Sequence, residues 1–110
     1  MKKDPTVFLK HILECISLIE KYTENLSKEE FLANIKVQDA TIRRLEIIGE
    51  ASRNLPDEFR KNYTDIAWKK ILAARNILAH NYFGIDLNTI WRIVQNDIQL
   101  LKEQINEMLS

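Results

Sequence analysis

Two side chains suited to phosphodiester chemistry lie five positions apart in the stretch RNILAHNY, residues 75–82. Arg75 carries a guanidinium, whose planar fork matches two oxygens of a phosphate. His80 carries an imidazole, the side chain best suited to moving protons near neutral pH. Cleavage of RNA needs both tasks, because protons must move at the 2′-hydroxyl and at the leaving group while charge on the phosphorus oxygens is held. We therefore interpret Arg75 and His80 as candidate catalytic residues.

The stretch is expected to be helical, and a helical wheel predicts where each side chain points. At about 100° per residue, Arg75 falls inside the apolar stripe of the helix, and Tyr82 lies about 20° from it. His80 lies about 140° from Arg75, at the side of the stripe. A guanidinium in a core-facing stripe needs a partner or its own cavity. The stripe consists of Trp68, Ile71, Leu72, Leu78 and Ala79.

Candidate partners for Arg75 lie in the preceding long segment, where charged residues recur within a band about 80° wide. One interpretation is a solvated face with Asp39–Arg43 and Glu50–Arg53 pairs along the helix, each contributing about 0.3 kcal/mol. The other is a buried salt bridge between Arg75 and either Glu46 or Glu50, with Gly49 allowing the two helices to approach closely. The charged residues are Asp39, Arg43, Glu46, Glu50 and Arg53.

The motif also has plain structural interpretations. His80 and Asn81 are polar residues that could close a helix, where a histidine interacts favourably with the C-terminal dipole. Tyr82 could be a core residue with its hydroxyl at the edge. The catalytic interpretation has a geometric requirement of its own. Arg75 and His80 point in different directions from one helix, so the two side chains of a single protomer make a poor site. Two copies about a twofold axis would gather two arginines and two histidines around one cleft, which predicts a composite site at a homodimer interface.

The elements that position these residues are predicted to be helices. The 110 residues include only two glycines and two prolines, and apolar residues recur at three- and four-residue spacing. We expect one domain over residues 1–110, an all-α antiparallel up-and-down bundle of four main helices plus one or two short ones. The main helices are expected from Pro5 to about Thr23, from Val37 to Leu55, from Asp65 or Ile66 to Gly84, and from Asp86 nearly to the C-terminus.

Local signals mark several of these boundaries. Asp4 is expected to cap the first helix, with Pro5 at its first position. Ser27 and Glu30 form a capping box that opens a short helix. Pro56 ends the second main helix, and a turn or short helix with Phe59 and Tyr63 follows. The last helix carries an apolar seam of Leu87, Ile90, Val94, Ile98, Leu101, Ile105 and Met108.

Composition and charge exclude several classes of protein. The formal net charge is zero, so RNA binding must use a local basic cluster, and it gains strength where two such surfaces combine. Cys15 is the only cysteine and is expected to be a core residue, which excludes an intrachain disulfide and suits a reducing cytoplasm. No apolar run is long enough for a membrane span, and the N-terminal residues lack a secretory signal. We expect a cytoplasmic protein without a membrane partner.

Other catalytic motifs are not indicated by the sequence. His11 is far from His80 in sequence, and Cys15 has no cysteine partner for a metal site. There is no serine-nucleophile motif and no glycine-rich phosphate loop. We therefore expect neither a metal ion nor a cofactor.

The segment Arg75 to Tyr82 resembles the Arg-x4-His-x-Tyr motif of HEPN domains. The surrounding blocks DATIRRLEIIGEASRNLP and WKKILAARNILAHNYFGIDLNTIW, with the C-terminal seam, are similar to the HepT-like subfamily along nearly the whole chain. This resemblance implies a dimeric all-α HEPN bundle that acts as the toxin of a type VII-like toxin–antitoxin pair. Its partner would be an MntA-like minimal nucleotidyltransferase antitoxin.

The resemblance also implies roles for individual residues. Arg75 and His80 would catalyse metal-independent cleavage of RNA, with Asn76 as a polar supporting residue. Glu46 and Glu50 are the further supporting candidates. Tyr82 matches the family tyrosine to which the antitoxin attaches AMP, which would block the cleft with bulk and negative charge.

Two other functions stay open at this stage. One is a non-catalytic helical module that binds a nucleotidyltransferase partner. The other is a motif that serves the dimer alone, with Arg75 paired to a carboxylate across the twofold axis.

Overall fold

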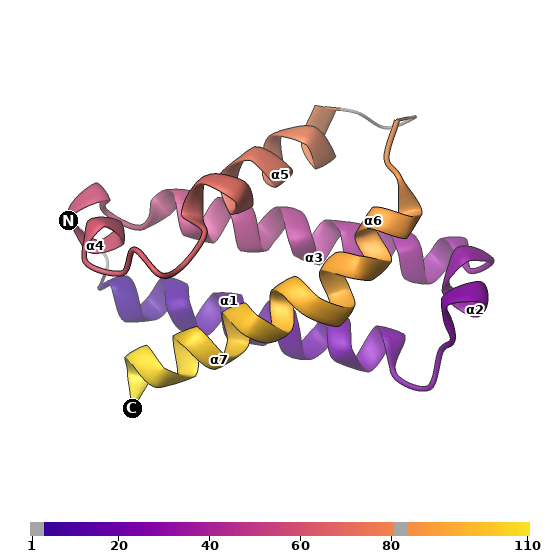
Figure 1. Ribbon diagram of the computed structural model, residues 1–110, viewed down its shortest axis with the longest axis horizontal. Coiled ribbons are helices and arrows are strands. Elements are labelled where there is room, and N and C mark those ends of the chain that lie inside the picture. The colour runs from indigo at the N-terminus through magenta and orange to yellow at the C-terminus, as the bar shows by residue number, and fades with distance from the viewer. Residues whose placement is uncertain (1–3, 81–83) are drawn as a thin grey trace.

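The computed structural model describes residues 4–80 and 84–110, apart from the side chain of His80. All regular structure within these residues is helical, and the long segments run alternately up and down the molecule (Figure 1). The predicted all-α antiparallel bundle is therefore confirmed. The elements are α1 (Pro5–Thr23), α2 (Lys28–Leu32), α3 (Ile35–Asn54), α4 (Asp57–Lys61), α5 (Trp68–His80), α6 (Leu87–Arg92), a π-helical turn η1 (Ile93–Asp97) and α7 (Ile98–Leu109).

The helix starts that were predicted from capping residues are confirmed. The Asp4 carboxylate accepts a hydrogen bond from the Thr6 amide at 2.9 Å, and Asp86 caps α6 in the same way. Ser27 and Glu30 exchange both hydrogen bonds of the capping box. The Ser27 amide holds the pKa of Glu30 below its usual value, because it stabilises the ionised carboxylate. This contribution to stability is present near neutral pH and is lost as the pH falls through the lowered pKa.

The start of α5 differs from the prediction. The helix begins at Trp68 rather than at Asp65 or Ile66. Two side-chain hydrogen bonds hold the preceding residues in a turn. The Trp68 indole donates to the Tyr63 carbonyl at 3.0 Å, and the side-chain amide of Gln104 on α7 donates to the Asp65 carbonyl at 3.0 Å. The predicted end at Gly84 depends on residues 81–83, which lie outside the described part, so it stays a prediction.

Two other helices also differ from their predicted bounds. Helix α3 begins at Ile35, two residues early, because the Asn34 side chain caps it by accepting from the Val37 amide at 3.1 Å. The last helix is interrupted by η1, where the Asn96 side chain donates to the Arg92 carbonyl at 3.2 Å. The Arg92 carbonyl, which would otherwise accept only backbone hydrogen bonds, thus accepts a side-chain hydrogen bond at the point where the helix widens into a π turn.

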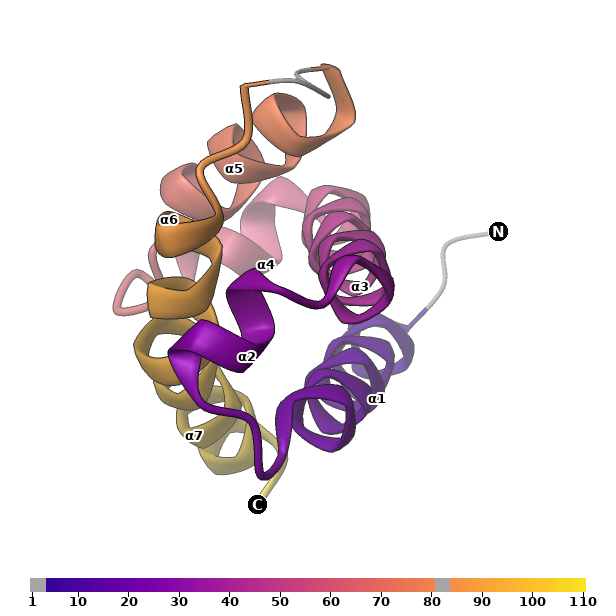
Figure 2. The same cartoon turned by 90° about the vertical axis from the view of Figure 1, so that its right-hand side faces the viewer.

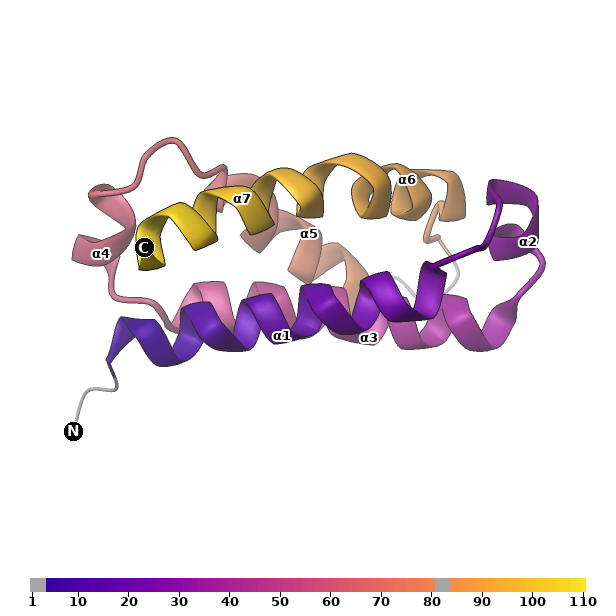
Figure 3. The ribbon, with the colours of Figure 1, turned by 90° about the horizontal axis from the view of Figure 1, so that it is seen from below.

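The helices enclose one hydrophobic core. Figure 2 shows the bundle end-on. Helix α1 packs along α3, α5 packs on α3, and α7 packs on α1. Helix α2 lies at one end, against α3 and α6 (Figure 3). Cys15 is buried as predicted, and burial raises the pKa of its thiol. None of the described helices is both long and apolar enough to cross a membrane. The most deeply buried side chains include Ile12, Ile16, Ile19, Phe31, Leu55 and Ile105.

Candidate active site

Arg75 lies on the side of α5 that faces α3, as the helical wheel predicts. Its side chain is 26% exposed, so it is partly buried and still reaches solvent. Its Nη2 lies 2.9 Å from Oε2 of Glu50 on α3. The structure thus decides between the two candidate partners in favour of Glu50. This oxygen is buried and, among residues 4–80 and 84–110, accepts no well-aligned hydrogen bond, so its contact with Arg75 is an ion pair of imperfect geometry.

The close approach of α5 to α3 depends on Gly49, as the sequence predicts. A Cβ atom placed on Gly49 would lie 2.3 Å from the Arg75 Cβ and 2.7 Å from its Cγ. These atoms belong to the root of the side chain, which cannot move without the helix. A larger residue at position 49 would therefore push α5 away from α3, and the hydrogen in place of a side chain is what lets Arg75 reach Glu50.

Asn76 holds the second terminal nitrogen of the same guanidinium. Its Oδ1 accepts a hydrogen bond from Nη1 of Arg75 at 3.1 Å. With Glu50 at Nη2, the Arg75 guanidinium is restrained at both ends. This geometry agrees with the supporting role that the resemblance implies for Asn76.

Glu46 lies one turn away from Glu50 and has a different partner. Its Oε2 lies 3.4 Å from Nη1 of Arg43 on the same helix, where Arg43 is 66% exposed. Exposed pairs of this kind contribute little stability. Among the described residues the pair along α3 is thus Arg43–Glu46 rather than the expected Asp39–Arg43 and Glu50–Arg53, and Glu50 pairs across to α5 instead.

Arg75 and these charged residues line an open cleft of about 480 Å³ between α1, α3 and α5. Phe8, Ile47, Ala51 and Ala79 supply apolar parts of its wall. The polar side chains of the cleft are His11, Arg43, Glu46, Glu50, Asn54 and Arg75.

The sequence interpretation missed His11, which it considered only as a metal ligand. His11 is an exposed residue of α1, and it reaches the cleft because α1 packs antiparallel to α3. The only signal in the sequence is its position one turn after Phe8, whose side chain also lines the cleft. That spacing places both on one face of a helix but does not say what the face meets.

His80 is the last residue of α5, and its side chain, with the whole of Tyr82, lies outside the described part of the chain. On a helical wheel of α5, position 80 lies about 140° around from Arg75. Positions 73, 77 and 80 share that side of α5, and Ala73 is exposed while Ile77 is 56% exposed. The exposed surface on this side of α5 is mixed, because Lys69 and Asn76 lie there beside Ala73 and Ile77.

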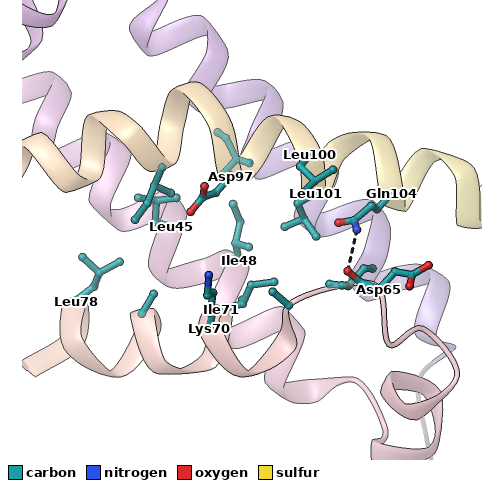
Figure 4. A pocket seen from close by; sticks show the side chains of 15 residues that line it. Leu45, Ile48, Asp65, Lys70, Ile71, Leu78, Asp97, Leu100, Leu101 and Gln104 are labelled. Carbon is teal, nitrogen blue, oxygen red and sulfur yellow. Dashed lines mark hydrogen bonds between the residues drawn. The ribbon is translucent and has the colours of Figure 1, made fainter.

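A second concavity lies on the other side of α5, between this helix and the C-terminal segment. Figure 4 shows its lining, in which Leu45 and Ile48 of α3, Ile71 of α5 and Leu101 of α7 are joined by the polar side chains of Asp65, Lys70, Asp97 and Gln104. Its volume is about 220 Å³. It contains neither Arg75 nor Glu50, so the polar cleft is the better candidate for an active site.

Within residues 4–80 and 84–110, without the His80 side chain, no group of three or more histidine, cysteine, aspartate or glutamate residues is arranged to hold a metal ion.

Comparison with known proteins adds independent evidence. The family described as "Ribonuclease HepT-like" matches residues 12–108. The protein named "Probable ribonuclease HepT" from Thermococcus cleftensis is 41% identical over 108 residues, which is 98% of this chain and 98% of that protein. A protein of Caldanaerobacter subterraneus subsp. tengcongensis named as a "Putative RNase" is 42% identical over 109 residues, covering 98% and 96% of the two chains.

A longer relative carries the same region beside another named activity. The Methanocaldococcus jannaschii protein named "Gamma-glutamylcyclotransferase and putative RNase" is 49% identical over all 110 residues, but the chain spans only 50% of its length. No solved structure matches the chain significantly.

Proposed function

The chain belongs to the ribonuclease HepT-like family, and on that premise we propose that it is a metal-independent endoribonuclease that uses Arg75 and His80. It acts in the cytoplasm as the toxin of a type VII-like toxin–antitoxin pair. The observation that carries the proposal is the state of Arg75, a partly buried arginine whose guanidinium is held at both ends beside an open cleft. Such a group matches the charge and the geometry of a phosphodiester.

The chemistry follows from the properties of these two side chains. A phosphate oxygen replaces Glu50 Oε2 at the guanidinium, where a phosphate can make the paired hydrogen bonds that the present ion pair lacks. An imidazole of His80 takes the proton of the 2′-hydroxyl, and the 2′-oxygen attacks phosphorus. The bond from phosphorus to the 5′-oxygen breaks, and that oxygen takes a proton from water, while the His80 imidazolium returns to solvent the proton it accepted. The products are a 2′,3′-cyclic phosphate and a free 5′-hydroxyl, while Arg75 stabilises the charge that develops on phosphorus.

The site is proposed to be shared between two copies of the chain. Arg75 faces α3 of its own protomer, whereas position 80 leaves α5 in a direction about 140° away. One phosphate is therefore more easily reached by an arginine of one protomer and a histidine of the other. The exposed Ile77 on that side of α5 supports this arrangement, because a second copy packed there would cover its side chain.

Ribonuclease activity is tested with purified protein and RNA in the presence of a chelator such as EDTA. Wild-type protein is expected to shorten the RNA and to leave cyclic phosphate ends, since no step requires a divalent ion. Analysis of the fragment ends by mass spectrometry checks the product chemistry. Expression without a nucleotidyltransferase partner is expected to arrest growth. Harmless expression together with intact RNA would refute the enzyme and favour a non-catalytic module that binds the partner.

Regulation is proposed to act at Tyr82, through a nucleotidyltransferase antitoxin. The phenol oxygen attacks the α-phosphorus of ATP, a new bond joins tyrosine to AMP, pyrophosphate leaves and the phenol proton passes to solvent. The added phosphate brings negative charge two residues from His80 and opposes the entry of RNA.

For this modification, Tyr82→Phe is expected to abolish the mass increase of one AMP group that appears after incubation with the partner and ATP. Phenylalanine keeps the ring but lacks the attacking oxygen. Intact-protein mass spectrometry provides the measurement, and Tyr63→Phe serves as the matched control because Tyr63 is exposed and lies outside the motif. If the Tyr82→Phe protein still gains the mass, the modification lies elsewhere.

A further inference from the structure

His11 occupies an unusual position in the cleft that contains Arg75. Arg43 pairs with Glu46, Arg75 pairs with Glu50, and the Asn54 side chain donates to the Glu50 carbonyl at 2.9 Å. The imidazole of His11, in contrast, makes no hydrogen bond or ion pair with any other residue in the described part of the chain. Its ring nitrogens are thus available to a molecule that enters the cleft.

The other charges of the cleft nearly cancel, so the imidazole of His11 matters for binding an anion. The two arginines are each matched by a glutamate, so the cleft without His11 is close to neutral and presents two carboxylates to an entering anion. A phosphodiester that enters must displace at least one of these pairs. An imidazole at the side of the cleft donates hydrogen bonds to phosphate oxygens and offsets the repulsion by the carboxylates.

The shape of the cleft allows a strand to contact both residues. The cleft is open, has a volume of about 480 Å³ and extends from Arg75 of α5 to His11 of α1. A strand whose reacting phosphate is bound by Arg75 therefore has an open path toward α1. Phe8, one turn before His11, adds an apolar surface to the same wall.

We propose that His11 binds the RNA backbone in this cleft, at a phosphate next to the one that Arg75 holds, so that each protomer contributes an RNA-binding subsite from α1. The proposal rests on the ribonuclease function proposed above and extends it to a substrate-binding residue outside the motif. It also assigns the RNA-binding face of the protomer to the side formed by α1, α3 and α5.

The test compares His11→Ala with Lys10→Gln, its neighbour on α1. Lys10 is exposed and does not line the cleft, so its removal reports the general effect of one charge. The dissociation constant for a short, fluorescein-labelled single-stranded RNA of mixed sequence is measured by anisotropy, in protein that also carries His80→Ala to prevent cleavage. His11→Ala is expected to raise the dissociation constant about tenfold, the effect of losing a hydrogen bond to a charged group. Lys10→Gln is expected to change it by less than about twofold.

A second measurement separates binding from folding and from catalysis. With His80 intact, His11→Ala and His11→Gln are expected to raise KM more than they lower kcat. Their melting temperatures should stay near that of the wild type, because an exposed side chain contributes little to stability.

The outcomes distinguish this proposal from the function on which it rests. Equal dissociation constants for His11→Ala and the parent protein, with RNA still cleaved by the wild type, would overturn the role of His11 and leave the ribonuclease standing. If Lys10→Gln raises the dissociation constant as much as His11→Ala does, overall charge alone explains the effect of His11, and the subsite is refuted. Failure of the wild type to bind or cleave RNA would overturn both.

Discussion

Replacement of His80 by alanine is expected to slow RNA cleavage by about two to four orders of magnitude, the usual contribution of a general acid or base. The imidazole is the proposed carrier of the 2′-hydroxyl proton, and no second group on α5 replaces it in the proposed mechanism. Position 80 is the last residue of α5, so the bundle should keep its stability. Initial rates on a labelled RNA, with the melting temperature as a control for folding, provide the measurement.

The shared site makes a sharper form of this prediction possible. Arg75→Ala is expected to lower the rate by about two to three orders of magnitude, because the charge on phosphorus loses its stabilising partner. Mixed dimers of an Arg75→Ala protomer and a His80→Ala protomer still contain one intact arginine and one intact histidine on opposite copies. Co-expression of the two variants should therefore restore part of the activity that each lacks.

Each result of the mixing experiment has a definite meaning. Restored cleavage supports a site built from both protomers. A mixture as inactive as its parents, in which mixed dimers are detected by mass, would place both residues of a working site in one chain and refute the composite arrangement. An Arg75→Ala variant that is monomeric would point to a structural role for Arg75 at the dimer interface.

Gly49→Ala is expected to destabilise the bundle by about 1–3 kcal/mol, as overpacked core positions do. The new methyl group would sit 2.3 Å from the Arg75 Cβ, closer than two such atoms can approach. In a helix without this contact, alanine would instead stabilise by about 1 kcal/mol relative to glycine, so the sign of the change is decisive. For a domain of this size, each kcal/mol corresponds to a shift in melting temperature of about 4–8 °C.

A double variant isolates the contact responsible. Arg75→Gly removes both the Cβ and the Cγ that a methyl group on residue 49 would meet, leaving the Arg75 Cα at 3.5 Å, an ordinary contact distance. Gly49→Ala should therefore cost much less stability in the Arg75→Gly background than in the wild type. A rise in the melting temperature of the single variant, or the same loss in both backgrounds, would show that α3 and α5 are not packed as closely as described.

The same substitution is expected to affect activity through geometry. A displaced α5 moves the Arg75 guanidinium away from Glu50 and from its position in the cleft. Cleavage by the Gly49→Ala protein should be reduced even under conditions where most of the protein is folded. Rates measured well below the melting temperature test this.

Features that depend on neighbouring residues could be predicted from the sequence alone. The cap at Asp4, the capping box of Ser27 with Glu30 and the cap at Asp86 all appear as expected, because each joins atoms two or three residues apart. The apolar periodicity gives the four main helices for the same reason, and it also places Arg75 on the core-facing side of its helix. The motif that identifies the candidate catalytic residues is likewise contained within eight consecutive positions.

Other features were decided by contacts between segments that are distant in sequence. The turn before α5 is held by Gln104, 39 residues away, and local propensity alone favoured an earlier start. The choice of Glu50 over Glu46 depends on where α5 crosses α3, because both carboxylates lie on one face of α3 and only the crossing point brings one within 2.9 Å of Arg75. His11 reaches the cleft only because α1 packs antiparallel to α3. The sequence determined which helices form and which chemistry the motif carries, whereas the packing of those helices determined which charges meet and which residues share the cleft.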